Sequence, residues 1–132
     1  MMSCHKRRRV SIFEGKEIKH LEYSKEGPKS RSYAFCADTK YDEEILNYID
    51  TLDLIYHEST FLEGMKNRAK KTFHSTALDA AKIASLANAS KLLIGHFSAR
   101  YNDIKDFEIE AKSVFENTVA VKDGDVFKIE NR

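Results

Sequence analysis

Short apolar runs alternate with stretches of helical spacing over most of the chain. The apolar runs are residues 33–37, 52–56 and 91–95. Runs of this length, bounded by polar or turn-forming residues, are typical of buried strands. The stretches with helical spacing or helix-end signals are residues 42–49, 76–88 and 103–115. Strands and helices in this alternating order predict an α/β layered domain.

The clearest helix signal begins at Thr76. Thr76 and Asp79 have the spacing of a capping box, with Asp in place of the usual Glu. One face of this helix carries only small side chains, at Ala77, Ala80, Ala81, Ala84 and Ala87. We therefore expect the helix to pack closely against the sheet.

Weaker patterns complete the chain at both ends and in the middle. Residues 10–13 and 18–23 alternate as strands do, and the polar segment between them predicts a hairpin. Residues 63–71 are expected to form a polar connection with several basic side chains. Two closing strands are expected at 118–121 and 125–129, around a turn at 122–124.

Composition limits the range of functions. The 132 residues suffice for one domain, and the net charge of +1 gives no global field that would attract nucleic acid. Residues 1–9 end in a basic run, for which a disordered terminus is favoured over a phosphate-binding element. No apolar run reaches the roughly 18 residues that span a bilayer. Cys4 and Cys36 form no disulfide framework, so we expect a cytoplasmic protein without a membrane partner.

Reactive side chains follow each of the three apolar runs. Asp38 follows the first, His57 and Glu58 the second, and His96 the third, while His74 precedes a helix. If the strands are parallel, these groups meet at one edge of the sheet. Carboxylate and imidazole together suit a divalent metal, zinc above all, or a general acid–base pair. Caps and hydrogen-bonding residues at strand ends remain the alternative.

Five short motifs carry a resemblance to a known family. They are residues 35–39 (FCADT), 57–61 (HESTF), 74–76 (HST), 96–101 (HFSARY) and 115–120 (FENTVA), the last followed by Asp123-Gly124. In this order they resemble the C-terminal half of ribonuclease Z, the zinc-dependent endoribonuclease of the metallo-β-lactamase superfamily that removes the 3′ trailer from precursor tRNA. The resemblance implies that residues 1–132 form one domain. It would be half of an αββα sandwich, a mixed sheet with helices on one face.

The resemblance also implies roles for individual residues. Asp38 matches the aspartate that bridges two zinc ions, and His96 matches a histidine ligand of one of them. His74 matches a histidine proposed to donate a proton or to steady the phosphate at cleavage. Arg100 matches an arginine that contacts substrate phosphate, a task that suits its guanidinium group.

Glu58 lies in the family's His-Glu-Ala-Thr motif, where this chain has Ser59 in place of alanine. The resemblance implies that Glu58 orients a neighbour, with His74 the first candidate. His57 is expected to be structural. The basic side chains of 66–71 are expected either to help hold tRNA or to form a solvated loop.

The main metal motif of the family, His-x-His-x-Asp-His, is absent. The histidines of this chain are His5, His20, His57, His74 and His96, and none has that spacing. Catalytic zinc usually has three protein ligands. We therefore expect the isolated chain to bind zinc weakly and to cleave tRNA poorly. Half of a sandwich also leaves an apolar sheet face, so we expect a homodimer unless residues 10–23 cover that face.

Two other functions remain open. The first is a different metallo-β-lactamase-type hydrolase that acts on a small ester or phosphoester, which a cleavage assay on precursor tRNA would distinguish. The second is a non-catalytic tRNA-binding or assembly module, for which binding without turnover would fall steeply with salt.

Overall fold

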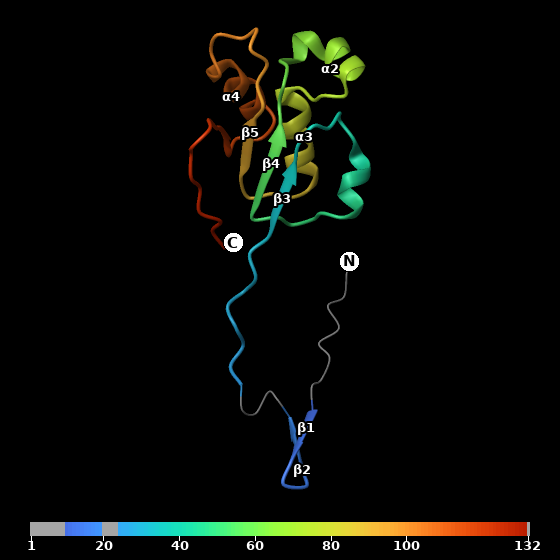
Figure 1. Cartoon of the computed structure of the whole chain (residues 1–132), viewed down its shortest axis with the longest axis vertical. Helices are drawn as coiled ribbons and strands as arrows, with labels where there is room; N and C mark the ends of the chain where they lie inside the picture. The colour runs from blue at the N-terminus through green and yellow to red at the C-terminus, as the bar shows by residue number, and fades with distance from the viewer. Residues whose placement is uncertain (1–9, 20–23, 132) are drawn as a thin grey trace.

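A four-stranded sheet with helices on one face forms the body of the molecule. The computed structural model describes residues 10–19 and 24–131. The strands lie in the order β3-β4-β5-β6. Their bounds are Tyr33–Cys36, Leu54–Glu58, Leu92–Gly95 and Thr118–Ala120. Helices α3 (Ala77–Leu86) and α4 (Lys105–Lys112) lie behind the sheet in Figure 1. The α/β fold class and the helices on one face are confirmed.

All neighbouring strands of this sheet are parallel, which corrects the expectation of a mixed sheet. Each connection from β3 to β6 crosses over through helical structure, and such crossovers produce parallel pairs. In the register, Cys36 pairs with His57, and Glu58 pairs with Gly95. The carboxyl ends of β3, β4 and β5 therefore lie level at one edge of the sheet.

The core lies between the sheet and α3. The five expected alanines of this helix are all buried, together with Ile55, Leu92, Ile94 and Phe107. Thr76 and Asp79 form the expected capping box, in which the Thr76 hydroxyl accepts from the Asp79 N–H and the Asp79 carboxylate accepts from the Thr76 N–H. The close packing of small residues brings α3, and with it His74 just before its start, against the sheet.

Two local predictions need correction. Residues 63–71 are helical: η2 (Glu63–Met65) leads into α2 (Lys66–Thr72), where only Ala69 is buried, so no apolar stripe marked the helix. The short helix expected at 42–49 does form, as the 3₁₀ helix η1 (Glu43–Asn47). Residues 125–129 form no strand, because β6 pairs in parallel with β5 and gives no hairpin for them to close.

The N-terminal hairpin forms as expected but lies away from the sheet. Strands β1 (Val10–Phe13) and β2 (Lys16–Lys19) pair antiparallel, and an extended segment, residues 24–32, leads from them toward the body (Figure 1). The side chains described in β1 and β2 are mostly exposed. The hairpin therefore does not cover the sheet. Residues 1–9, expected to be disordered, lie outside the described residues. So do residues 20–23, the last part of the expected second strand.

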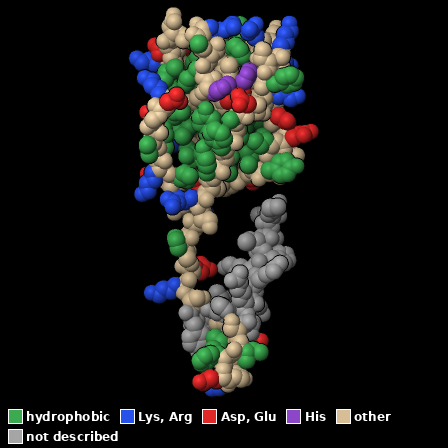
Figure 2. All heavy atoms as spheres, viewed as in Figure 1, with side chains coloured by type: hydrophobic (Ala, Val, Ile, Leu, Met, Phe, Trp, Pro, Cys, Tyr) green, Lys and Arg blue, Asp and Glu red, His purple; other side chains and the backbone are tan. Residues whose placement is uncertain are grey.

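The second face of the sheet is open and apolar. Figure 2 shows hydrophobic side chains over the strands on this face, with histidine and acidic side chains at its upper edge. Tyr33 and Phe35 are 48% and 64% exposed, although the sequence predicted a buried strand there. The Phe35 ring stacks on Tyr56, and Gly95 lies against the Tyr56 ring. Within the described residues, no helix is long and apolar enough to cross a membrane.

Candidate metal centre

Three side chains from separate segments converge at the carboxyl edge of the sheet. Asp38 follows β3, His96 follows β5, and His74 precedes α3. One potential ligand atom from each lies within 4.8 Å of the others. Asp38 Oδ1 lies 3.5 Å from His96 Nε2, and the two histidine rings lie 5.4 Å apart. The sequence-based expectation that these groups meet at one edge is met.

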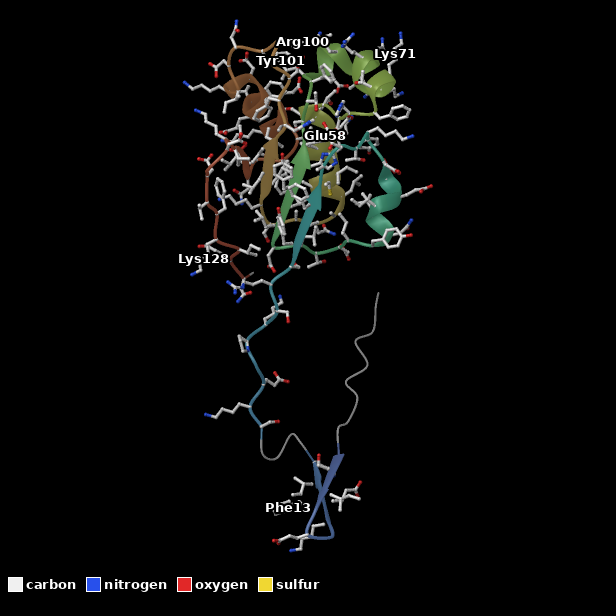
Figure 3. All side chains as sticks on the ribbon, in the orientation of Figure 1. Phe13, Glu58, Lys71, Arg100, Tyr101 and Lys128 are labelled. Atoms are coloured by element: carbon white, nitrogen blue, oxygen red, sulfur yellow. The ribbon has the colours of Figure 1, made fainter. Side chains whose placement is uncertain are left out.

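A buried carboxylate directly beneath this cluster holds its surroundings together. Glu58 is fully buried at the end of β4 (Figure 3). Its Oε1 accepts hydrogen bonds from the Thr39 N–H (3.0 Å) and from His74 Nδ1 (2.6 Å). Its Oε2 accepts from the Thr60 N–H (3.2 Å), the Thr60 hydroxyl (2.7 Å) and the Ser75 N–H (3.2 Å). Glu58 thus bonds directly to the segments that carry Asp38 and His74, and it reaches the segment of His96 only through Thr60.

His96 is held from the same side. Its Nδ1 lies 2.9 Å from Thr60 Oγ1, and the Thr60 carbonyl accepts from the Ser98 N–H at 3.0 Å. The anchored nitrogen of each histidine is therefore Nδ1, on Glu58 for His74 and on Thr60 for His96. The other nitrogen, Nε2, is left for the cluster.

The cluster fits a divalent metal. His96 offers an imidazole nitrogen and Asp38 a carboxylate oxygen, both of which zinc prefers, and His74 lies beside them as a further potential ligand or a proton donor. The Nδ1 contacts also resemble the outer hydrogen bonds that orient histidine ligands in metal proteins. Asp38, at 77% side-chain exposure, and His96, at 49%, leave the site open to solvent and to further ligands.

Backbone conformation at the cluster is unusual. Asp38 and His96 have left-handed φ angles of 48° and 64°, and Phe73, just before His74, has φ 58°. A residue with a Cβ in this region costs about 1–2 kcal/mol, and aspartate, among the non-glycine residues, is better tolerated there. Strained residues persist when the surrounding structure fixes them, and they cluster at functional sites.

Arg100 lies above the cluster at the top of the molecule (Figure 3). Its guanidinium group packs 5.5 Å from the centre of the Phe61 ring and makes a contact with Met65 Sδ at 3.1 Å. Within the described part of the chain, no carboxylate forms a salt bridge with it. Figure 2 shows further Lys and Arg side chains along this edge, over α2. The edge is therefore suited to an anion.

His57 does not join the cluster. It is 2% exposed in the core, where its Nδ1 lies 2.8 Å from the Glu58 carbonyl oxygen. Burial lowers the pKa of His57 below its ordinary value. The ring is thus a neutral hydrogen-bond donor inside the fold, as the structural interpretation expected.

This depressed pKa predicts that acid weakens the fold. The unfolded chain takes up a proton near the ordinary histidine pKa of about 6.5, whereas folded His57 resists protonation until a lower pH. Stability therefore falls as the pH drops below about 6.5, by up to about 1.4 kcal/mol per pH unit from this group. We expect His57→Gln to reduce the loss of unfolding free energy between pH 7.5 and 5.5, measured by urea denaturation. Equal losses in the two proteins would contradict this.

Sequence reasoning overlooked part of the site. In the sequence Thr60 is one member of the HESTF motif with no role of its own, whereas in the structure its hydroxyl joins Glu58 to His96. The N–H groups of Thr39 and Ser75 on Glu58 were also missed, because a sequence pattern says nothing about backbone donors. The available signal was the position of Thr60, two residues after Glu58 at the end of a buried strand.

Curated proteins with similar sequences carry the name ribonuclease Z. A protein named ribonuclease Z from Cytophaga hutchinsonii is 51% identical over 104 residues, which are 79% of this chain and 33% of that protein. A ribonuclease Z from Porphyromonas gingivalis is 46% identical over 110 residues, or 83% of this chain and 36% of that protein. The chain thus spans about a third of the length of these curated relatives. No protein-family model matches it.

Two solved structures resemble the body of the molecule. The metallo-β-lactamase fold protein YhfI from Bacillus subtilis has a TM-score of 0.69 and 27% identity, covering 75% of this chain and 40% of that one. The short form of human tRNase Z has a TM-score of 0.52 and 28% identity, covering 65% of this chain and 28% of that one. The fold is therefore that of part of a metallo-β-lactamase fold protein.

Proposed function

We propose that this chain, a homologue of ribonuclease Z, supplies the C-terminal part of a zinc-dependent endoribonuclease. That enzyme removes the 3′ trailer from precursor tRNA. The observation that carries the proposal is the convergence of Asp38, His74 and His96 on one edge, in a chain 41–51% identical to ribonuclease Z proteins. The chain covers about a third of those proteins, and its 132 residues contain no His-x-His-x-Asp-His motif, so in this proposal further ligands of the site come from outside these residues.

Asp38 and His96 would hold zinc through Oδ1 and Nε2. Zinc, when bound, would polarise the phosphodiester and lower the pKa of a coordinated water. The residues of this chain then have separate tasks. The side chains of Asp38 and His96 are exposed to solvent, so a phosphodiester can approach them.

His74 would act as the proton donor at cleavage. Glu58 accepts from its Nδ1 at 2.6 Å, so when the ring carries a proton on both nitrogens, Nε2 is the atom that can hand a proton to the leaving oxygen. Glu58 stays within the protein and keeps the ring oriented. Arg100, which has no carboxylate partner among the described residues, would bind a phosphate oxygen of the substrate through its guanidinium group.

The missing His-x-His-x-Asp-His motif predicts that the chain alone is a poor enzyme. We expect the purified 132-residue chain to cleave precursor tRNA at no more than a trace rate with added Zn²⁺, because too few ligands are present. Metal content per chain and gel-based cleavage measure this. Robust zinc-dependent cleavage by the chain alone would overturn the prediction.

A chimera tests the proposed function itself. Residues 33–129 would replace the matching segment of the Cytophaga hutchinsonii ribonuclease Z, and cleavage of precursor tRNA would be measured. We expect activity that His74→Ala reduces by at least about 100-fold, the usual scale for general acid–base catalysis. The control is Ile109→Ala, an exposed position on α4. A folded chimera that binds precursor tRNA without cleaving it would support the non-catalytic module instead.

We also propose that a second copy of the chain covers the open sheet face. Tyr33, Phe35 and Tyr56 present aromatic surface there, beside a hollow of about 290 Å³ that borders His96. Exposed apolar surface of this kind favours association. We expect a dimer by light scattering, reduced by Phe35→Lys and unchanged by Ile109→Lys on the opposite face. A monomer at all concentrations would contradict this.

The remaining expectations follow from the proposed reaction. The chain would act as one domain corresponding to the C-terminal half of the ribonuclease Z-like fold, and its partner would be precursor tRNA. The location would be the cytoplasm. Cys36 fits this, since burial raises the pKa of its thiol and it remains a free cysteine.

A further inference from the structure

We infer that Thr60 is a positioning residue that fixes which nitrogen of His96 carries the proton. The Thr60 hydroxyl lies between the Glu58 carboxylate, at 2.7 Å, and His96 Nδ1, at 2.9 Å. Both distances are those of hydrogen bonds. A hydroxyl has a single proton, so it can donate to only one of these two neighbours.

The surroundings of Glu58 decide where that proton goes. Oε2 already accepts from two backbone N–H groups, those of Thr60 and Ser75, which can only donate. Oε2 is therefore an acceptor. If the Thr60 hydroxyl donated to His96 instead, the lone pairs of Thr60 Oγ1 would face the buried Glu58 Oε2 at 2.7 Å. Two acceptor atoms would then lie in contact with no proton between them. The Thr60 hydroxyl thus donates to Glu58.

The proton on His96 follows from this. Because the Thr60 hydroxyl donates its proton to the hydrogen bond with Glu58, Thr60 Oγ1 can only accept from His96. His96 Nδ1 must therefore carry the hydrogen. In the neutral ring the other nitrogen, Nε2, then has a free lone pair. Nε2 lies 3.5 Å from Asp38 Oδ1, so its lone pair is repelled by the carboxylate unless a cation lies between the two atoms. Thr60 therefore prepares His96 as a ligand before any metal arrives.

Without Thr60 the opposite tautomer would be favoured. Nε2 could then donate its proton in a hydrogen bond to Asp38, and this bond would occupy both atoms that are proposed to bind the metal. Outer residues that fix a histidine ligand in this way typically contribute 10–100-fold to metal affinity, and we expect about this loss in Thr60→Val. Thr60→Ser keeps the hydroxyl and should restore affinity.

The test uses the metal-free 132-residue chain labelled with ¹⁵N, at a pH well above the ordinary histidine range. Long-range ¹H–¹⁵N spectra distinguish protonated from unprotonated ring nitrogens. We expect His96 to be protonated on Nδ1 in the natural chain and in Thr60→Ser, and to shift toward Nε2 in Thr60→Val. Ser59→Ala is the matched control: Ser59 Oγ is buried next to Thr60 and has no hydrogen-bond partner among the described residues.

Each result has a consequence. An Nε2 proton on His96 in the natural chain, or a tautomer that does not change in a folded Thr60→Val, would overturn the inference. If Thr60→Val does not fold, the Nδ1 signature in the natural chain and in Thr60→Ser decides. The purpose of this arrangement rests on the proposed function, but the tautomer is read without metal or tRNA. Failure of tRNA cleavage would therefore leave it untouched.

Discussion

Replacing Glu58 with alanine should lower the unfolding free energy by about 3–5 kcal/mol, the scale of removing one partner from a buried charged network. Three backbone N–H groups, those of Thr39, Thr60 and Ser75, would lose the carboxylate that accepts their hydrogen bonds. Each buried donor left without a partner costs about 1–3 kcal/mol. The His74 ring would lose its anchor at the same time.

Urea denaturation measures this loss. Glu58→Gln keeps the shape of the side chain but removes its charge. Because the new amide N–H₂ must face other donors, this substitution should still lower the unfolding free energy by about 1–3 kcal/mol. Glu44→Ala, at an exposed position of η1, is the control and should change stability by less than about 0.5 kcal/mol. A small effect of Glu58→Ala would mean that water reaches these donors, and that Glu58 is not the hub of the site.

Glycine at Asp38 or His96 should separate metal binding from stability. Either substitution removes a ligand, so Zn²⁺ affinity should fall by more than the roughly 10–100-fold that loss of an outer partner causes. The unfolding free energy should nevertheless stay unchanged or rise by up to about 1 kcal/mol. The reason is that both residues have left-handed backbone angles, which glycine adopts without strain.

Alanine substitutions provide the matched comparison. Asp38→Ala and His96→Ala also remove the ligand but keep a Cβ at a positive φ, so they should be less stable than the glycine variants. Calorimetric Zn²⁺ titration and thermal denaturation together test the pair. A glycine variant that binds Zn²⁺ as well as the natural chain would place the metal elsewhere.

The sequence pattern predicted the layers of the fold better than its local details. The apolar runs of β4 and β5 and the alanine face of α3 mark buried elements directly, whereas the run of β3 marks a strand with one open face. Helix α2 was not predicted because only Ala69 of this helix is buried. The lack of a strand at 125–129 could not be predicted, because strand pairing depends on a distant partner. The parallel pairing of β6 is likewise a property of the whole sheet.

The meeting of Asp38, His74 and His96 could be predicted because parallel strands bring their carboxyl ends to one edge. Their motifs also resemble those of a known family. Thr60 could not be assigned in this way. Its role depends on two distances and on the direction of one hydroxyl proton, neither of which a residue pattern contains.

The all-parallel sheet has a consequence for how the chain folds. From β3 to β6, every pair of neighbouring strands is joined across a helical crossover, so no strand pair in the body can begin as a hairpin. Pairing then requires closure of long loops before its contacts are gained, which slows folding. Asp38, Glu58, His74 and His96 come from separate parts of this order. A partly formed sheet therefore cannot bring these side chains together. Ligand binding by the cluster would report that folding of the body is complete.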